Sequence, residues 1–263
     1  MKTLVLEKGE VCGIAHLDMR FYVLSRSPNA IIYYSDQSPF IKIKDFDITE
    51  HIKHPQDIAS CDISKCLYVT DIGNNCIWKV ERTYTFKLAQ WVSNITAPHT
   101  ISVGPEGRVV TFGNQSKSLD VYGKDTALLH RVPLPSEVKS PQHAVETSKG
   151  NYIVSYGELN GKKQGVCEIT VQGKVVRRYD HKTEKLNHPT HLAIDSEDKV
   201  FVVDNAHSRI LLLDNLLKLE QVLPSEEQDK LDKPFRICFK SIKGQRRLLV
   251  EHRINAVDIY SLT

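Results

Sequence analysis

The sequence has no long apolar run and no regular cysteine spacing, and each absence excludes a class of protein. No segment approaches the roughly 18 apolar residues that a membrane-spanning helix needs. Met1–Glu10 has an apolar core of only four residues before its charges begin, which is too short for a secretory signal. The six cysteines are Cys12, Cys61, Cys66, Cys76, Cys167 and Cys238. They lie scattered through apolar runs, which indicates reduced, buried thiols. We therefore expect a cytoplasmic protein with no membrane partner.

Helical patterns and common enzyme fingerprints are also scarce. The best helical candidate is Pro224–Pro234, where Ser225 could cap a single turn. No Gly-x-Ser-x-Gly nucleophile, phosphate loop or dinucleotide fingerprint occurs, and we expect no bound cofactor. The net charge of +3 is too small to indicate a nucleic-acid or membrane partner by itself.

The sequence does contain a pattern of apolar, strand-like runs that recurs six times. In Lys199–Asp214, two β-branched runs flank the polar loop Asp204–Arg209, which predicts two strands joined by a loop. A shorter apolar run, His191–Asp195, precedes them and predicts an inner strand. The matching units start near Cys12, Ile58, His99, His143, His191 and Arg236. The steps between them are 41 to 48 residues, which suits a four-stranded propeller blade.

Six such units predict an all-β fold, a six-bladed β-propeller of four-stranded antiparallel blades, with residues 1–263 as a single domain. The sixth unit stops after three strands, and a closed ring needs that blade completed by the other terminus. Met1–Lys8 is a spare strand, so we expect it to pair with Asn255–Tyr260. A WD-repeat propeller is excluded because the sequence has no Trp-Asp dipeptide. Ring closure leaves few free strand edges, so we expect a monomer.

Two units carry a more specific motif. VFVVDNAHSRILLLD at Val200–Asp214 resembles the core of an NHL repeat, and Asp57–Val80 follows the same pattern. The chain thus resembles the C-terminal propeller of tripartite-motif NHL proteins. This resemblance implies an interaction domain, as found in ubiquitin-ligase-like proteins, some of which bind proteins and others RNA. We expect Arg209 to contact Asp204 or a neighbouring blade. Cys76 stands at the place of that arginine in the second unit, so another contact must hold that junction.

Histidines concentrate on one face of the expected propeller. The loops between second and third strands and the links between blades emerge on this face, here called the loop face, where ligands usually bind. Nine of the eleven histidines fall there or at inner-strand starts: His51, His54, His99, His143, His181, His188, His191, His207 and His252. The candidate binding residues are His99, His143, His191, Asn74, Asn75, Asn205, His207, Arg209, Arg236 and Arg253.

Three of these histidines are also candidate metal ligands. His99, His143 and His191 occupy one register position in three consecutive blades by this alignment, and would point toward the channel mouth. Three neutral imidazoles plus a water would make an open zinc site. NHL-like propellers include a zinc-dependent lyase acting on hydroxyglycine peptides, although its ligands come from spaced blades. Alternatively, each histidine hydrogen-bonds the backbone of a neighbouring blade. Cys61 and Cys66 bracket a turn, and we expect them to be core residues rather than half of a zinc site.

Three functions therefore stay open. The first is a non-enzymatic interaction module or scaffold that binds a protein or peptide on the loop face, including substrate recognition in a ubiquitin-ligase-like protein. The second is a zinc-dependent lyase or hydrolase that uses the three histidines. The third is RNA binding along Lys162–Lys185, where positive charge is in excess. We favour the first, and thus not an enzyme, because charges on the loop face nearly balance and binding would depend on aromatic and arginine anchors.

Overall fold

The structure, a computed structural model, describes residues 2–37, 39–82, 86–113, 116–224, 231–242, 244–252 and 255–262. Within these ranges the chain forms strands, turns and one short 3-10 helix, η1 (Asn205–His207). The helical candidate at Pro224–Pro234 falls mostly on residues outside the described ranges. No helix in the described part of the chain has the length and apolar character to cross a membrane.

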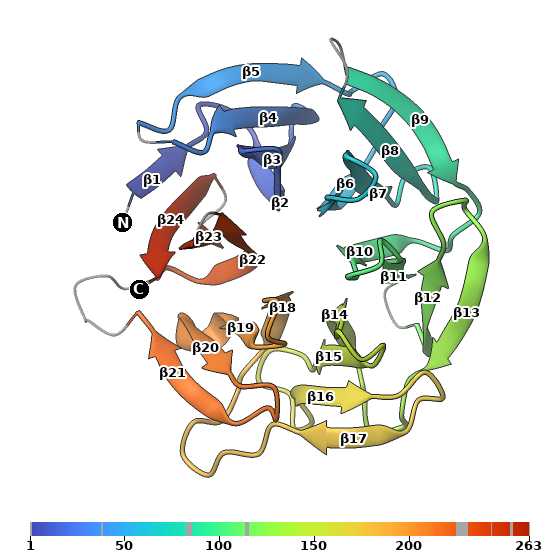
Figure 1. The fold of residues 1–263 in the computed structure, drawn as a ribbon, viewed down its shortest axis with the longest axis vertical. Coiled ribbons are helices and arrows are strands. Elements are labelled where there is room, and N and C mark those ends of the chain that lie inside the picture. Colours follow the sequence, from blue (N-terminus) through green and yellow to red (C-terminus); the bar gives the residue numbers. More distant parts are fainter. Residues whose placement is uncertain are drawn as a thin grey trace.

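The strands form six antiparallel sheets of four strands each, arranged as a ring (Figure 1). Blade 1 contains β2 (Glu10–Leu17), β3 (Arg20–Arg26), β4 (Ala30–Ser35) and β5 (Lys42–Asp47). Blade 2 contains β6 (Pro55–Cys61), β7 (Cys66–Asp71), β8 (Cys76–Arg82) and β9 (Phe86–Val92). Blade 3 contains β10 (Pro98–Val103), β11 (Val109–Gly113), β12 (Ser118–Tyr122) and β13 (Leu128–Pro133).

The second half of the chain repeats this order. Blade 4 contains β14 (Pro141–Glu146), β15 (Tyr152–Tyr156), β16 (Gly165–Ile169) and β17 (Val175–Arg178). Blade 5 contains β18 (Pro189–Ile194), β19 (Val200–Asp204), β20 (Arg209–Leu213) and β21 (Leu219–Leu223). Blade 6 contains β22 (Pro234–Ile242), β23 (Gln245–His252), β24 (Ala256–Leu262) and β1 (Lys2–Val5). The predicted fold class, a six-bladed all-β propeller, is therefore confirmed.

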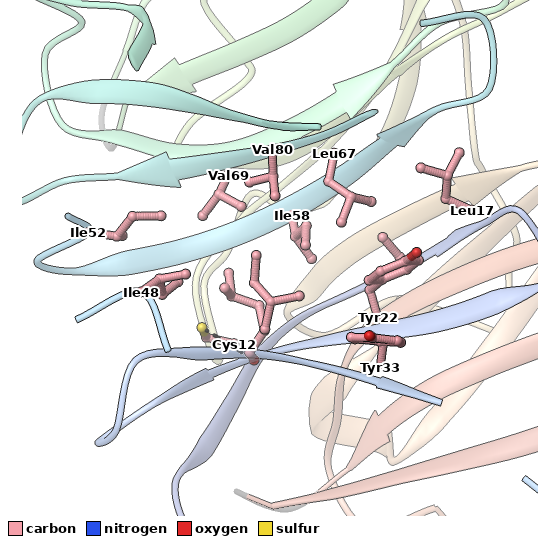
Figure 2. Packing of buried hydrophobic residues seen from close by; sticks show 13 residues of the cluster. Cys12, Leu17, Tyr22, Tyr33, Ile48, Ile52, Ile58, Leu67, Val69 and Val80 are labelled. Atoms are coloured by element: carbon pink, nitrogen blue, oxygen red, sulfur yellow. Dashed lines mark hydrogen bonds between the residues drawn. The ribbon is translucent and has the colours of Figure 1, made fainter. Parts of the chain in front are cut away.

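The three inner strands of each blade are largely buried on both faces because the blade packs between two neighbours, whereas outer strands such as β5 and β13 are mostly exposed. In β7, Leu67 and Val69 face blade 1, whereas Cys66 and Tyr68 face blade 3. Successive side chains of a strand point to opposite faces, so both sets must be apolar, and β7 is buried along its whole length. Figure 2 shows one such junction, where Tyr22 of blade 1 lies near Leu67 of blade 2. Six apolar clusters of the described residues follow this rule, one for each junction between blades.

The first strand closes the ring, as the sequence predicts. Strand β1 pairs antiparallel with β24, from Lys2 opposite Ile259 to Val5 opposite Ala256. The backbone N–H of Leu6 continues the contact by donating to the carbonyl of Asn255 over 2.9 Å. Blade 6 thereby receives its fourth strand from the start of the chain.

The neighbouring residues Leu4 and Val5 test this closure. Leu4 is buried in the junction of blades 6 and 1, whereas Val5 is 61% exposed. We expect Leu4→Ala to lower the free energy of unfolding by about 2–4 kcal/mol, because it leaves a cavity in that junction. The matched control Val5→Ala should change it by less than about 0.5 kcal/mol. Urea denaturation measures both, and equal effects would mean that β1 is not packed as described.

Candidate functional site

The inner strands are bulged at their starts in all six blades. The pairing register between the first and second strands shifts there every time. In blade 2, Pro55 pairs with Asp71 and Asp57 with Thr70, which leaves Gln56 as an extra residue. A bulge of this kind re-aims the side chains around it. In each blade, the position two residues after the last regular pair before the bulge is equivalent. It is occupied by Gly13, Asp57, Thr100, His143, His191 and Arg236.

This register corrects the alignment of the repeats. His143, His191 and Arg236 are equivalent, as expected, but Thr100 and not His99 takes that position in blade 3. His99 is the bulge residue itself, one place earlier. The unit starts predicted at Cys12 and Ile58 are also wrong by one residue. The equivalent positions are Gly13, one residue later, and Asp57, one residue earlier. A bulge inserts a residue without disturbing the apolar pattern that follows it, so spacing alone did not reveal the shift.

Asp57 is the centre of the site, and residues of four other blades surround it. Its Oδ2 accepts hydrogen bonds from the Thr100 hydroxyl (3.2 Å) and the Ile101 N–H (3.1 Å) of blade 3. The same oxygen lies 3.9 Å from Nε2 of His143 in blade 4 and 3.7 Å from Nε2 of His191 in blade 5. Its Oδ1 accepts from its neighbour Ile58 N–H and pairs with Arg236 of blade 6.

Arg236 supplies the compensating positive charge. Its Nη1 lies 3.2 Å from Oδ1 of Asp57, and its Nη2 donates to the Gln56 carbonyl over 2.6 Å. Burial would raise the pKa of Asp57, but Arg236 and the two histidines hold it below its usual range. Glu251, paired with Arg236 across β22 and β23, has its Oε2 3.9 Å from the guanidinium Nε. Burial raises the pKa of Glu251 to about 8 despite Arg236. The central cluster thus comprises Asp57, Thr100, His143, His191, Arg236 and Glu251.

Blade 1 contributes no side chain at this position, because its equivalent residue is Gly13. A Cβ on Gly13 would lie 2.7 Å from Ile58 Cγ2 and 2.9 Å from the Ile58 backbone nitrogen. Neither distance is tolerable for a carbon atom, so this position admits only glycine at the present spacing of β2 and β6. The glycine allows the two inner strands to approach each other beside Asp57.

The two imidazoles are neutral and stacked. Their ring centroids lie 3.7 Å apart with 28° between the planes. Burial lowers the pKa of His143 well below its usual range, and it also lowers the pKa of His191. Among the residues that the structure describes, neither ring has a partner within hydrogen-bonding distance at any of its nitrogens. Two neutral imidazoles and an ionised carboxylate are in the protonation state that metal binding requires.

Asp57, His143 and His191 are therefore the residues that could hold a metal ion. Their ligand atoms all lie within 4.8 Å of one another, and all three residues are buried. His99 does not belong to this group, although it is half-buried and burial lowers its pKa. A zinc ion bonds an imidazole nitrogen in the plane of its ring at about 2.0–2.1 Å. The two rings are stacked nearly parallel, so no single point lies in the planes of both rings near their Nε2 atoms. One ring would therefore have to turn before both could bind the same metal ion.

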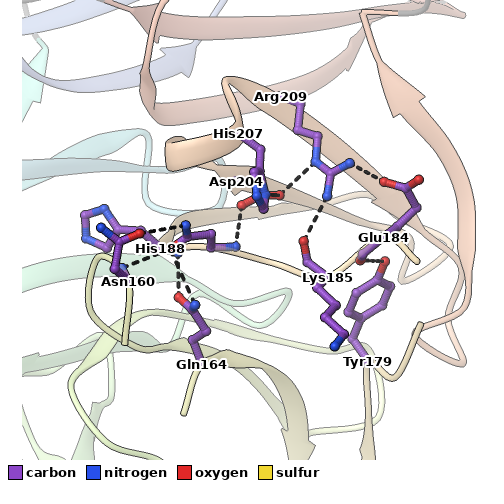
Figure 3. Close-up of polar contacts among 10 residues, drawn as sticks. Asn160, Gln164, Tyr179, Glu184, Lys185, His188, Asp204, His207 and Arg209 are labelled. Atoms are coloured by element: carbon purple, nitrogen blue, oxygen red, sulfur yellow. Dashed lines mark hydrogen bonds and ion pairs between the residues drawn. The ribbon is translucent and has the colours of Figure 1, made fainter. Parts of the chain in front are cut away.

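A second polar cluster, on the loop face, holds blades 4 and 5 together (Figure 3). Asp204 is fully buried, and its Oδ2 accepts from Nε of Arg209 over 2.8 Å. Its Oδ1 accepts from the backbone N–H of Asn187 in the link between the blades over 2.7 Å. Arg209 also pairs with Glu184 and donates to the Lys185 carbonyl. The expected contact between Arg209 and Asp204 is confirmed, and it anchors the link to the blade.

Asp71 performs the same task in blade 2 without an arginine. Its two oxygens accept from the N–H groups of Lys53 (3.1 Å) and His54 (2.9 Å) in the preceding link. Its Oδ2 also accepts from the Asn74 amide (2.6 Å) and the Trp78 indole (3.3 Å). Cys76 therefore needs no replacement partner, because Asn74 and Trp78 supply the donors that Arg209 supplies in blade 5.

Other proposed binding residues also make structural contacts on the loop face. The Asn75 side chain accepts from the N–H of Ala97 over 3.0 Å. The Asn205 amide donates to the Pro234 carbonyl over 2.9 Å, and Nδ1 of His207 lies 2.8 Å from Asp204. Arg253 lies outside the described residues. The Asn75 and Asn205 contacts join a loop to the start of the next blade, and the His207 contact lies within its own loop. His143, His191 and Arg236 instead meet at the centre of the ring.

Three members of the central cluster, Asp57, Thr100 and Glu251, were not predicted from the sequence. A signal for Asp57 was present, since Pro55 precedes it by two residues just as Pro141 and Pro189 precede His143 and His191. Aligning the prolines instead of the apolar runs would have placed Asp57 with the histidines. Nothing in the local sequence of Glu251 marks it, because its role depends on the pairing of β23 with β22.

The opposite face carries a cavity of about 410 Å³. It lies among the ends of β6, β10, β14 and β18 and the turns that follow them. Its wall includes Cys61 together with Asp62, Glu146 and Asp195. These carboxylates already pair with Lys240, Arg108 and Arg246 respectively. The cavity was not anticipated from the sequence, because the turns that form it share no motif.

Comparison with known proteins shows the fold but no family. No family model matches the chain, and no curated protein matches it. Virginiamycin B lyase from Staphylococcus aureus, solved as an inactive variant with quinupristin, superimposes with a TM-score of 0.68 at 12% identity, covering 100% of this chain and 99% of that one. A putative gluconolactonase gives 0.69 at 11%, covering 99% and 92%. A nidogen/laminin complex gives 0.65 at 14%, covering 84% and 82%. The chain is thus similar in fold to six-bladed propellers that include enzymes and a protein-binding domain.

The pKa of Glu251 makes stability depend on pH. Its value in the folded protein, about 8, lies above the ordinary 4.5, so the stability that its protonated form contributes is lost as pH rises through 8. We expect the free energy of unfolding to fall between pH 6.5 and 8 by up to about 1.4 kcal/mol per pH unit from this group. Glu251→Gln should remove that decline, and Glu197→Gln, at an exposed site, should keep it. Unfolding in urea across this range measures the effect, and parallel curves for wild type and Glu251→Gln would contradict it.

Proposed function

We propose that this propeller is a non-enzymatic binding module that takes a protein or peptide on its loop face, at the mouth of the central channel. The observation that carries the proposal is the ring of bulge residues at the inner-strand starts. These residues are Cys12, Gln56, His99, Gln142, Thr190 and Phe235. A bulge re-aims the side chains around it. Cys12 and Thr190 are buried, whereas Gln56, His99, Gln142 and Phe235 are partly exposed and are the side chains that we expect to contact a ligand.

The chemistry of this ring supports a peptide more than a nucleic acid. Phe235 is 37% exposed, and the guanidinium carbon of Arg236 lies 5.5 Å from its ring centroid. Gln56, His99 and Gln142 are half-buried and uncharged at neutral pH, since burial lowers the pKa of His99. Exposed aromatic side chains surrounded by polar groups are typical anchors of protein interfaces. RNA binding would need a row of unpaired cations at the same place.

The resemblance to NHL repeats gives this module a context. In tripartite-motif proteins such a propeller serves as an interaction domain, and we infer a corresponding role in partner or substrate recognition for this chain. The nidogen/laminin structure is consistent with protein binding by a propeller of this kind. Cytoplasmic location and a monomeric state belong to the same proposal.

Peptide selection tests the proposal and needs no identified partner. Peptides displayed on phage are selected on the immobilised full chain, and the affinities of the selected peptides are then measured with Phe235→Ala. We expect at least about a tenfold loss, because aromatic anchors dominate binding energy. The control Ile63→Ala removes another exposed apolar side chain on the opposite face and should not affect binding. Peptides that bind Phe235→Ala as well as wild type would overturn the proposal.

An RNA ligand would give a different result. Binding of labelled single-stranded RNA whose affinity falls steeply with salt would favour the RNA alternative, since that slope counts displaced counterions. The peptide proposal expects a shallow salt dependence.

Metal-dependent chemistry is a second candidate, because the ligand atoms of Asp57, His143 and His191 lie within 4.8 Å of one another. We expect metal analysis of protein purified without an affinity tag to return well under one zinc per chain, because the stacked rings do not share a coordination point. Near-stoichiometric zinc that disappears in His143→Ala, but persists in the control His181→Ala at an exposed histidine, would favour a metal-dependent lyase or hydrolase instead.

A further inference from the structure

Two cysteines at the turn of the first hairpin in blade 2 lie directly opposite each other. Cys61 ends β6, Cys66 begins β7, and the two are register partners in the antiparallel ladder. Both belong to the apolar junction with blade 3, so their side chains lie on the same face of the hairpin. Opposite residues of an antiparallel pair have Cα atoms about 4.5–5.5 Å apart. Disulfides span Cα separations of about 4.4–6.8 Å, so this pair can be joined without moving either strand far.

The surroundings of Cys61 favour its thiolate. The backbone N–H of Ser64 donates to its Sγ over 3.4 Å. A hydrogen bond with the Cys66 thiol lowers the pKa of Cys61 to about 5, and the same contact raises the pKa of Cys66. The positive charges of Lys65 and Lys79 also act on Cys61. A thiolate stabilised by N–H donors and cations is the reactive form of cysteine.

Cys61 also has a route to small reagents. Only 1% of the Cys61 surface is exposed, but the residue lines the cavity of about 410 Å³ on the opposite face. The thiols of Cys12, Cys76, Cys167 and Cys238 do not line that cavity. Burial raises the pKa of all four, so they are protonated and unreactive at neutral pH. The structure therefore distinguishes one cysteine pair from the rest.

We propose that Cys61 and Cys66 form a redox pair that hydroperoxides oxidise to an intramolecular disulfide, with Cys61 as the attacking thiolate and Cys66 as the resolving thiol. In the first step, Cys61 attacks the terminal peroxide oxygen, the O–O bond breaks, and the released hydroxide, or alkoxide from an alkyl hydroperoxide, takes the original thiol proton to become water or an alcohol. Cys61 becomes a sulfenic acid. In the second step, Cys66 attacks that sulfur, the S–O bond breaks, and the hydroxyl leaves as water with the Cys66 proton. The two thiols together supply the two electrons that reduce the peroxide.

Peptide mapping after treatment with hydrogen peroxide tests the pair. The reduced full chain is oxidised with a slight excess, alkylated in denaturant and digested with trypsin, which cleaves after Lys65 between the two cysteines. We expect the chain to lose two of its six thiols and His54–Lys65 to be linked to Cys66–Lys79. Cys66→Ser should instead leave Cys61 as a sulfenic acid that dimedone labels. Cys61→Ser should lose no thiol.

Cys76 shares a tryptic peptide with Cys66, and it therefore provides the control. In Cys76→Ser the linked peptide should persist unchanged, since only Cys61 and Cys66 are needed. The proposal is overturned if wild type keeps all six thiols, if the linkage disappears in Cys76→Ser, or if the disulfide joins two chains on a non-reducing gel. Reduction with dithiothreitol should restore both thiols, which separates a disulfide from irreversible oxidation.

Discussion

The inner strands of each blade have no polar face, and this constraint decides the rest of the architecture. In β7, alternate side chains enter two different apolar clusters, one shared with blade 1 and one with blade 3. A blade with only one neighbour would expose half of its apolar side chains to water, which is unfavourable in proportion to the area exposed. The sheets must therefore form a closed ring. The pairing of β1 with β24 completes it by giving the last blade its outer strand.

A closed ring brings six inner strands together at its centre, and that meeting creates a problem of buried charge. Asp57 and Arg236 are both almost fully buried, and a buried charge without a partner is costly. The structure resolves this by letting the two pair, and by giving the remaining oxygen of Asp57 donors from blade 3. The stacked imidazoles stay neutral beside them. A centre of this kind brings groups from five blades to one carboxylate.

The sequence allowed much of the fold to be predicted and less of the site. The six units, the spare first strand and the contact between Arg209 and Asp204 all followed from local patterns of apolar and polar residues. The prediction that His143 and His191 meet also held, because both follow a proline at the start of an apolar run. His99 was misplaced by one residue, since Pro-His-Thr and Pro-x-His are equally compatible with an inner strand until the bulge is seen. The loop-face residues Asn74, Asn75 and Asn205 were expected to bind ligands, but the described contacts of their side chains join loops to links.

The sequence by itself determined the strand periodicity, the number of blades and the closing strand, because each depends on residues that are near in the chain or on an unpaired edge that must be covered. Only the tertiary structure decided that His143, His191 and Arg236 meet around the Asp57 carboxylate, and that Cys61 lines a cavity formed by the turns of several blades. The physical reason is that these neighbours come from different blades, some of them about 180 residues apart along the chain. Their contacts are set by the register of the bulges and the closure of the ring, which no local pattern specifies.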